Sequence, residues 1–177
     1  FNSFRKTYTS VFDIKADVAL TVYGEMSIDK IREKFMKADF IYVGGGDTIF
    51  MLRHWEKTGL LSLIKDAYNR GVIVCGLSAG AICWFEQMYT DSELAGSAET
   101  YAIFSGLGWI KGTISPHYNV RLLDFDEKIL YNNIDAFGLE DCSAIEVVNG
   151  KIIRSISATG RAFSLHCHEG RLVEEIV

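Results

Sequence analysis

The stretch VIVCGLSAG, residues 72–80, decides how this chain is expected to fold. Its first four residues are almost wholly apolar, which is typical of a parallel strand covered by helices on both faces. The next five follow the pattern G-x-S-x-G, in which small residues permit a sharp strand-to-helix turn that projects the serine hydroxyl out of the backbone. Ser78 is therefore a candidate nucleophile at the carboxyl end of a strand. The alternative interpretation is that Ser78 only caps the helix that follows.

Predicted strands and helices alternate around this stretch at the spacing of βαβ units. The pattern predicts strands at 18–23 and 40–43, helices at 27–35 and 47–69, a helix after Ser78, and the second half of a helix at 1–12. Asp47 is the expected N-cap of the long helix, which we expect to break near Gly59. Together these elements predict an α/β fold of three layers, with a mostly parallel sheet between helices on both faces.

The last third of the chain changes to β-hairpins. Asn149-Gly150 separates apolar runs at 144–148 and 151–157, and Glu169-Gly170 separates runs at 163–168 and 171–176. No linker interrupts the sequence, so we predict a single α/β domain over 1–177. Because the chain opens on half a helix, we expect this domain to be N-terminally incomplete, with its first strand missing upstream of Phe1.

Composition narrows the class of protein. The chain has 177 residues, of which 49% are hydrophobic, and a formal net charge of -5. The negative charge and the lack of basic clusters disfavour nucleic acid as a partner. No apolar run is long enough to span a membrane and no signal segment opens the chain. We therefore expect a cytoplasmic protein, a monomer or homodimer, with neither nucleic-acid nor membrane partners.

The cysteines and the two histidines near the C-terminus are the candidate metal ligands of the sequence. The four cysteines are scattered without a C-x-x-C spacing, which favours free thiols; they are Cys75, Cys83, Cys142 and Cys167. His166 and His168 flank Cys167, but their alternation is typical of a strand with both histidines on one face. We therefore expect no metal and no cofactor.

A serine nucleophile needs a base and an orienting acid. His117 follows a short β-like run, 112–115, where a strand should give way to a loop, and could reach the edge that carries Ser78. The other three histidines lie in a predicted helix or a late strand. Asp91 is the expected acid because it lies in a polar loop beyond the helix after Ser78, with Glu93 as the reserve, whereas Glu86 on that helix should point away.

Backbone N–H groups complete the expected site. Ala79, directly after the nucleophile, and Gly45 and Gly46 in the Gly44-Gly45-Gly46 loop are the expected donors to an oxyanion. Glycine lets the backbone approach closely and leaves its N–H groups uncovered. A phosphate-binding loop is the alternative, but G-x-G-x-x-G would require glycine at position 49, where the chain has Ile49.

Three ordered motifs resemble those of the dipeptidase E family of serine peptidases, which includes aspartyl dipeptidases and cyanophycinases. They are FIYVGGGDT at 40–48, GLSAGA at 76–81 and SPHYN at 115–119, and the resemblance runs from about residue 10 to the C-terminus. His117 follows Ser78 by only 39 residues, which suits this family better than the ordinary α/β-hydrolase fold. Asp47 stands where many members of the family carry asparagine.

The resemblance implies a fold like that of the class I glutamine amidotransferases, which is flavodoxin-like. It also implies a triad of Ser78, His117 and Asp91, the hydrolysis of small peptides, and dipeptides with an N-terminal aspartate as the family's familiar substrates. A cation would then have to meet the substrate carboxylate, and Arg121 and Arg161 are the candidates. The rival functions are an amidase or esterase with another small substrate, and a non-catalytic binding or regulatory domain of the same fold.

Overall fold

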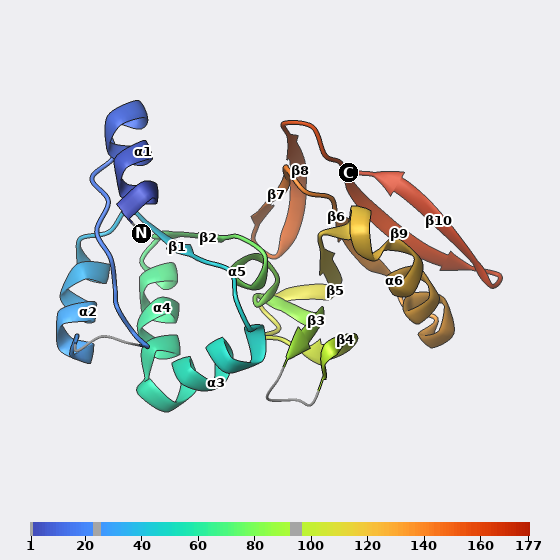
Figure 1. Cartoon of the computed structure of the whole chain (residues 1–177), viewed down its shortest axis with the longest axis horizontal. Helices are drawn as coiled ribbons and strands as arrows, with labels where there is room; N and C mark the ends of the chain where they lie inside the picture. Colours follow the sequence, from blue (N-terminus) through green and yellow to red (C-terminus); the bar gives the residue numbers. More distant parts are fainter. Residues whose placement is uncertain (1, 23–25, 93–96) are drawn as a thin grey trace. The chain divides into compact units, whose positions relative to one another are not determined.

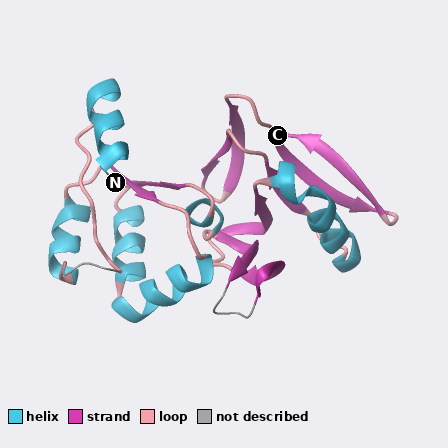
Figure 2. Cartoon of the chain, in the orientation of Figure 1, coloured by secondary structure: helices cyan, strands magenta, loops and turns pink. Residues whose placement is uncertain are grey.

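The computed structural model describes residues 2–22, 26–92 and 97–177 as a mixed α/β protein. Its contacts group the chain into two compact units, residues 1–41 with 53–74 and residues 42–52 with 75–177. Figure 2 shows that helices dominate the first unit and strands the second. The strands β1 (Phe40–Val43) and β2 (Ile73–Gly76) and the helix α3 (Thr48–Thr58) each contribute residues to both units.

The first unit is built from short amphipathic helices. It contains α1 (Asn2–Phe12), α2 (Ile28–Met36) and α4 (Leu60–Asn69), together with the second half of α3. The α4 helix buries one face at helical spacing, Leu60, Leu63, Ile64 and Ala67, and packs against α2. Ser27 caps α2 through its hydroxyl, which accepts the Lys30 N–H. The helices predicted at 1–12 and 27–35, and the break at Gly59, are confirmed.

The strand predicted at 18–23 is wrong where the structure describes it. Residues 18–22 form no strand, and Tyr23 lies outside the described residues. Leu20 and Val22 are nearly half exposed, and the carbonyl oxygen of Thr21 lies 2.6 Å from His54 Nε2, the distance of a hydrogen bond. An apolar run becomes a strand only where a neighbouring strand offers backbone hydrogen bonds. Here the His54 side chain contacts the Thr21 carbonyl oxygen instead.

The second unit contains a six-stranded mixed sheet, whose strands Figure 1 labels. The strand order is β10-β9-β6-β5-β3-β4, and only β3/β5 and β5/β6 pair in parallel. The strands are β3 (Phe85–Ser92), β4 (Ser97–Ser105), β5 (Ile110–Pro116), β6 (Ala136–Leu139), β9 (Ala162–His168) and β10 (Arg171–Ile176). The α/β class is confirmed, but this sheet is mixed rather than mostly parallel, because hairpin connections add antiparallel strands at its edges. Only four residues separate β3 from β4, too few for a parallel crossover.

Two further pairings complete the strands. In the β1/β2 pair, Ile73 N–H donates to Asp39 and Leu77 N–H to Val43, at the constant offset of a parallel ladder. The antiparallel pair β7 (Ser143–Val148) and β8 (Lys151–Ser157) forms a two-stranded sheet of its own. Both predicted C-terminal hairpins are confirmed, with Asn149 and Glu169 in the left-handed region and a glycine after each.

The core of the second unit lies between the sheet and α6 (Tyr118–Asn132), which Figure 1 shows beside β9. The helix buries Tyr118, Phe125 and Ile129 at spacings of seven and four, against residues of β3, β6 and β9. This packing fixes the N-terminus of α6, directly after His117.

The helix predicted after Ser78 is much shorter than expected. The α5 helix spans only Ala79–Ile82, and β3 begins at Phe85. Glu86 therefore lies on a strand, where it pairs with Lys111 of β5 at 3.2 Å. Residues 85–92 pair with strands on both sides, so tertiary hydrogen bonding overrides local helical propensity there.

Candidate active site

Ser78 lies on a tight turn between β2 and α5, with φ 52° and ψ -116°. Positive φ is rare for a residue with a side chain. Two glycines make this turn possible, because backbone atoms pack so closely against them that no side chain would fit. A Cβ on Gly76 would lie 2.1 Å from the Gly80 carbonyl oxygen, and one on Gly80 would lie 2.3 Å from the Val43 carbonyl oxygen. The small residues of the G-x-S-x-G motif are therefore required by the crossing of β1, β2 and α5.

The side chain of Ser78 turns toward a histidine instead of capping its helix. No side-chain cap is formed on α5 by Ser78, whose hydroxyl lies 3.0 Å from His117 Nε2. His117 follows β5 and precedes α6, with φ 55° and ψ 38°. The two residues that the sequence singles out are thus within hydrogen-bonding distance, although 39 positions separate them.

The other ring nitrogen of His117 meets a carboxylate. His117 Nδ1 lies 2.5 Å from Asp141 Oδ1, and Asp141 comes directly after Glu140 at the end of β6. A Nδ1–H that donates to Asp141 leaves Nε2 free to accept from the Ser78 hydroxyl. Ser78, His117 and Asp141 therefore have the connectivity of a Ser-His-Asp triad.

Asn119 holds the carboxylate of Asp141 in place. The Asn119 amide donates to Asp141 Oδ2 at 3.3 Å, and its carbonyl oxygen accepts the Asp141 backbone N–H at 3.0 Å. The hydrogen bond from His117, followed by that from Asn119, holds the pKa of Asp141 below its usual range. The Asp141 side chain is consequently ionised at neutral pH.

The acid expected at Asp91 is not the partner of His117 in the structure. Both ring nitrogens of His117 are engaged, one by Ser78 and one by Asp141, while Asp91 lies on β3 rather than in a loop. The reserve, Glu93, lies outside the described residues. Asp141 lies beyond His117 in the chain, outside the interval between Ser78 and His117 in which the sequence predicts the acid. Since β5 and β6 are parallel neighbours, the residues after β6 reach the same sheet edge as His117.

The glycine loop lies beside Ser78. A Cβ on Gly45 would lie 3.3 Å from Ser78 Cβ, and Gly44, Gly45 and Gly46 are all exposed. Asp47 caps α3 as predicted, since its carboxylate accepts the Phe50 N–H at 2.9 Å. The backbone of Gly45 thus passes beside Ser78, as an oxyanion site requires, and Ala79 directly follows Ser78 in the chain.

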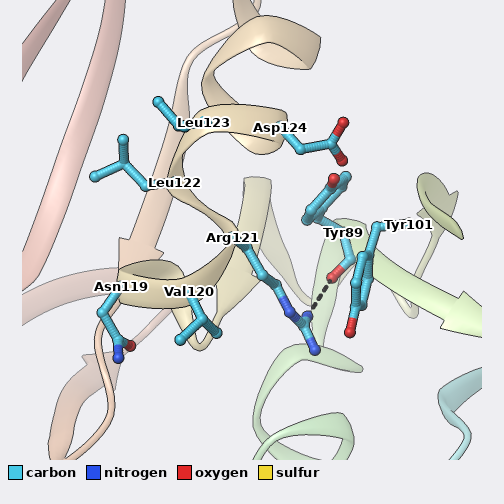
Figure 3. Close-up of a pocket in the computed structure, with 8 residues that line it drawn as sticks. All are labelled: Tyr89, Tyr101, Asn119, Val120, Arg121, Leu122, Leu123 and Asp124. Atoms are coloured by element: carbon cyan, nitrogen blue, oxygen red, sulfur yellow. Dashed lines mark hydrogen bonds between the residues drawn. The ribbon is translucent and has the colours of Figure 1, made fainter.

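A cavity of about 310 Å³ lies beside the first turn of α6, and Figure 3 shows its lining. Asn119, which holds Asp141, also lines this cavity, whereas Ser78, His117 and Asp141 do not. The Arg121 guanidinium stacks 4.2 Å from the centre of the Tyr101 ring and donates to the Tyr89 carbonyl oxygen at 3.3 Å. Within the described part of the chain, Arg121 Nε is buried without a hydrogen-bond partner. Arg161, by contrast, forms paired hydrogen bonds with Glu140.

The histidines and cysteines outside this site form no cluster that could bind a metal ion in the described part of the chain. His166 hydrogen-bonds Ser164 at 2.8 Å and lies 3.4 Å from Asp135. Among the residues that the structure describes, no three His, Cys, Asp or Glu side chains are grouped to hold a metal ion, and Cys83, Cys142 and Cys167 are free thiols. None of the helices in these same ranges is long and apolar enough to cross a membrane.

Comparisons with known proteins agree with the motifs. The model of peptidase family S51 matches residues 2–155. The uncharacterized peptidase YgaJ of Bacillus subtilis is 33% identical over 72% of this chain and 55% of its own, and a Salmonella arizonae peptidase E is 26% identical over 80% of this chain and 66% of its own. The chain thus spans about half to two thirds of these relatives. A crystal structure of a candidate peptidase E from Listeria monocytogenes has a similar fold, with a TM-score of 0.54 and 20% identity over 93% of this chain and 70% of that one.

Proposed function

Because the chain belongs to peptidase family S51, we propose that it hydrolyses small peptides through a triad of Ser78, His117 and Asp141. The observation that carries the proposal is the continuous series of contacts from the Ser78 hydroxyl through both His117 ring nitrogens to Asp141. Asp141 takes the place that sequence reasoning gave to Asp91.

The proposed reaction follows from this connectivity. His117 Nε2 accepts the hydroxyl proton as Ser78 Oγ attacks the amide carbonyl carbon, and Asp141 stabilises the imidazolium that forms. The N–H groups of Gly45, Gly46 and Ala79 are the proposed donors to the tetrahedral oxyanion. His117 then gives its proton to the leaving amine. Water, deprotonated by the same ring, attacks the acyl-enzyme, releases the acid product and restores Ser78.

The finer proposal concerns substrate choice. We propose that Arg121 attracts an acidic group of the substrate, such as the side chain of an N-terminal aspartate, because it lines the same cavity as Asn119, which hydrogen-bonds Asp141. The charge of Arg121 already acts on Asp141, where it helps to lower the pKa of that carboxyl. Arg161 is the weaker candidate, since Glu140 already engages its guanidinium. An Arg121→Gln variant should lose cleavage of Asp-initiated dipeptides much more than of Ala-initiated ones.

The test of the main proposal is labelling with a fluorophosphonate probe and cleavage of a dipeptide panel. Wild type should be labelled, and both labelling and cleavage should fall at least about a thousandfold in Ser78→Ala and His117→Ala. Ser105→Ala, an exposed serine on β4, is the matched control and should behave as wild type. Labelling without dipeptide cleavage would favour an amidase or esterase. Absence of labelling would favour a non-catalytic domain.

A further inference from the structure

The end of the glycine loop is tied to the last residue of β3 by Asp47. The Ser92 hydroxyl lies 3.0 Å from Asp47 Oδ1 and 2.9 Å from Asp47 Oδ2, and Ser92 is only 2% exposed. One position after Asp47 and two positions before Ser92, the hydroxyl oxygens of Thr48 and Thr90 meet at 3.4 Å, and both residues are buried. Two neighbouring contacts therefore join the start of α3 to β3.

These contacts of Asp47 and Thr48 with β3, which we call the tether, hold the C-terminal end of the glycine loop. The upstream end is held where the Val43 carbonyl oxygen accepts the Leu77 N–H at 3.0 Å. Between the two ends lie three exposed glycines, with Gly46 at φ 141°. Glycine has the largest backbone freedom of any residue, so the path of the loop past Ser78 depends on where its ends are held.

We propose that Asp47 and Ser92 are positioning residues, which hold the backbone of Gly45 and Gly46 at the distance from Ser78 that an oxyanion requires. The inference rests on the proposed function, because it matters only if Ser78 is a nucleophile. The Asp47 carboxylate is turned to Ser92 and the Phe50 N–H, so both residues act through the loop rather than on the substrate. Their loss should weaken transition-state stabilisation while leaving ground-state binding unchanged.

Asp47 has two separable tasks, which permits a matched pair of variants. It caps α3 through Phe50 N–H and it accepts the Ser92 hydroxyl. Asp47→Ser keeps a good N-cap residue, but its oxygen is one bond closer to the backbone and should not reach Ser92. Asp47→Asn keeps both the cap and an acceptor oxygen at the original distance. Ser92→Ala removes the tether from the other side.

The experiment measures the rate of phosphonylation by a fluorophosphonate probe at several probe concentrations. In this reaction Ser78 Oγ bonds to phosphorus, fluoride leaves with the electron pair, and His117 takes the hydroxyl proton. We expect the maximal labelling rate to fall about ten- to a hundredfold in Asp47→Ser and Ser92→Ala. The probe concentration at half-maximal rate should stay within about twofold of wild type, and Asp47→Asn should be near wild type. The double variant should be no slower than the slower single one.

Three outcomes would overturn the inference. They are an unchanged maximal rate in folded Asp47→Ser, an equal loss in Asp47→Asn and Asp47→Ser, and losses in the two single variants that multiply in the double variant. Melting temperatures within about 3 °C of wild type verify folding. Should Ser92→Ala fail to fold, the two Asp47 variants decide. If wild type itself is not labelled, the proposed function fails, and this outcome is distinct from a labelled wild type whose variants are equally fast.

Discussion

Ser78 and His117 both lie where a strand turns into a helix, yet the two turns are built differently. At Ser78 the turn leads into a helix of four residues, and it is held by backbone atoms packed against backbone atoms. At His117 the turn leads into a helix of fifteen residues whose buried aromatic side chains anchor it to the sheet. Both residues have positive φ, but the ψ of Ser78 lies far from the left-handed helical value that His117 nearly adopts.

The difference teaches how the two side chains are held. The conformation of Ser78 is imposed by its immediate backbone surroundings, so tolerance to change there should be very low. The conformation of His117 is set by side chains: Tyr118, which follows it and is buried, and Asp141, which hydrogen-bonds its ring. Substitutions at the Ser78 turn, the elbow, should thus destabilise it through backbone clashes. Substitutions at the His117 turn, the histidine turn, should act through lost hydrogen bonds and packing.

The largest expected effect is on activity, from Asp141→Asn. This change keeps the shape of the side chain but removes the charge that stabilises the imidazolium and favours the working tautomer of His117. We expect kcat to fall about 10³- to 10⁴-fold, with folding retained. Asp91→Asn is the matched control, since Asp91 lies on β3 away from both ring nitrogens of His117, and it should retain wild-type activity. Equal losses in the two variants would return Asp91 to consideration as the acid.

The next effect, on stability, compares the two turns directly. A Cβ on Gly80 would lie 2.3 Å from one backbone oxygen and 2.7 Å from another, and neither can move without displacing β1. We expect Gly80→Ala to lower the free energy of unfolding by about 4 kcal/mol or more. A Cβ on Gly138 would instead meet the Tyr118 ring at 2.6 Å, and we expect a loss of about 1–3 kcal/mol in Gly138→Ala.

Chemical denaturation of both variants measures this difference. Gly44→Ala is the control, because Gly44 has φ outside the left-handed region and a Cβ there would meet nothing within 4 Å. A Gly138→Ala variant less stable than Gly80→Ala would show that the two turns are not held as described.

The smallest effect concerns acid stability at the histidine turn. The pKa of Asp141 in the folded protein is lowered, mainly by the hydrogen bond with His117, whereas its unfolded value is near 3.9. The stabilisation is therefore fully present above about pH 4 and is lost as the pH falls through the lower folded pKa. The difference in unfolding free energy between wild type and Asp141→Asn should therefore shrink as the pH falls below about 4. Because Asp141 is half exposed, the difference should be small and should also shrink in high salt. A difference that is independent of pH would contradict the assigned cause.

Local signals in the sequence predicted much of this structure. The elbow, the glycine loop with its Asp47 cap, the break at Gly59 and both C-terminal hairpins each depend on turn or capping chemistry within a few residues. Ser78 and His117 were brought together by one topological rule, that the carboxyl ends of parallel strands share an edge.

Local signals in the sequence could not predict which distant segments pair with one another. The run at 18–22 is mostly apolar but forms no strand, and residues 85–92 become a strand because β4 and β5 flank them. The contact between His117 and Asp141 was not predicted for the same reason. It depends on β6 lying next to β5 in parallel, which no spacing between Ser78 and His117 reveals.

The turn that carries Asp141 is itself shaped by a glycine from the far end of the chain. A Cβ on Gly160 would lie 2.0 Å from the Asp141 carbonyl oxygen, and the neighbouring Arg161 clasps Glu140 through both its backbone N–H and its guanidinium. The loop between β8 and β9 thus fixes the backbone conformation of the turn that carries Asp141, although the loop contributes no reacting group. A random-mutagenesis screen for folded but inactive protein should therefore recover hits at Gly160, more than eighty positions beyond the nucleophile.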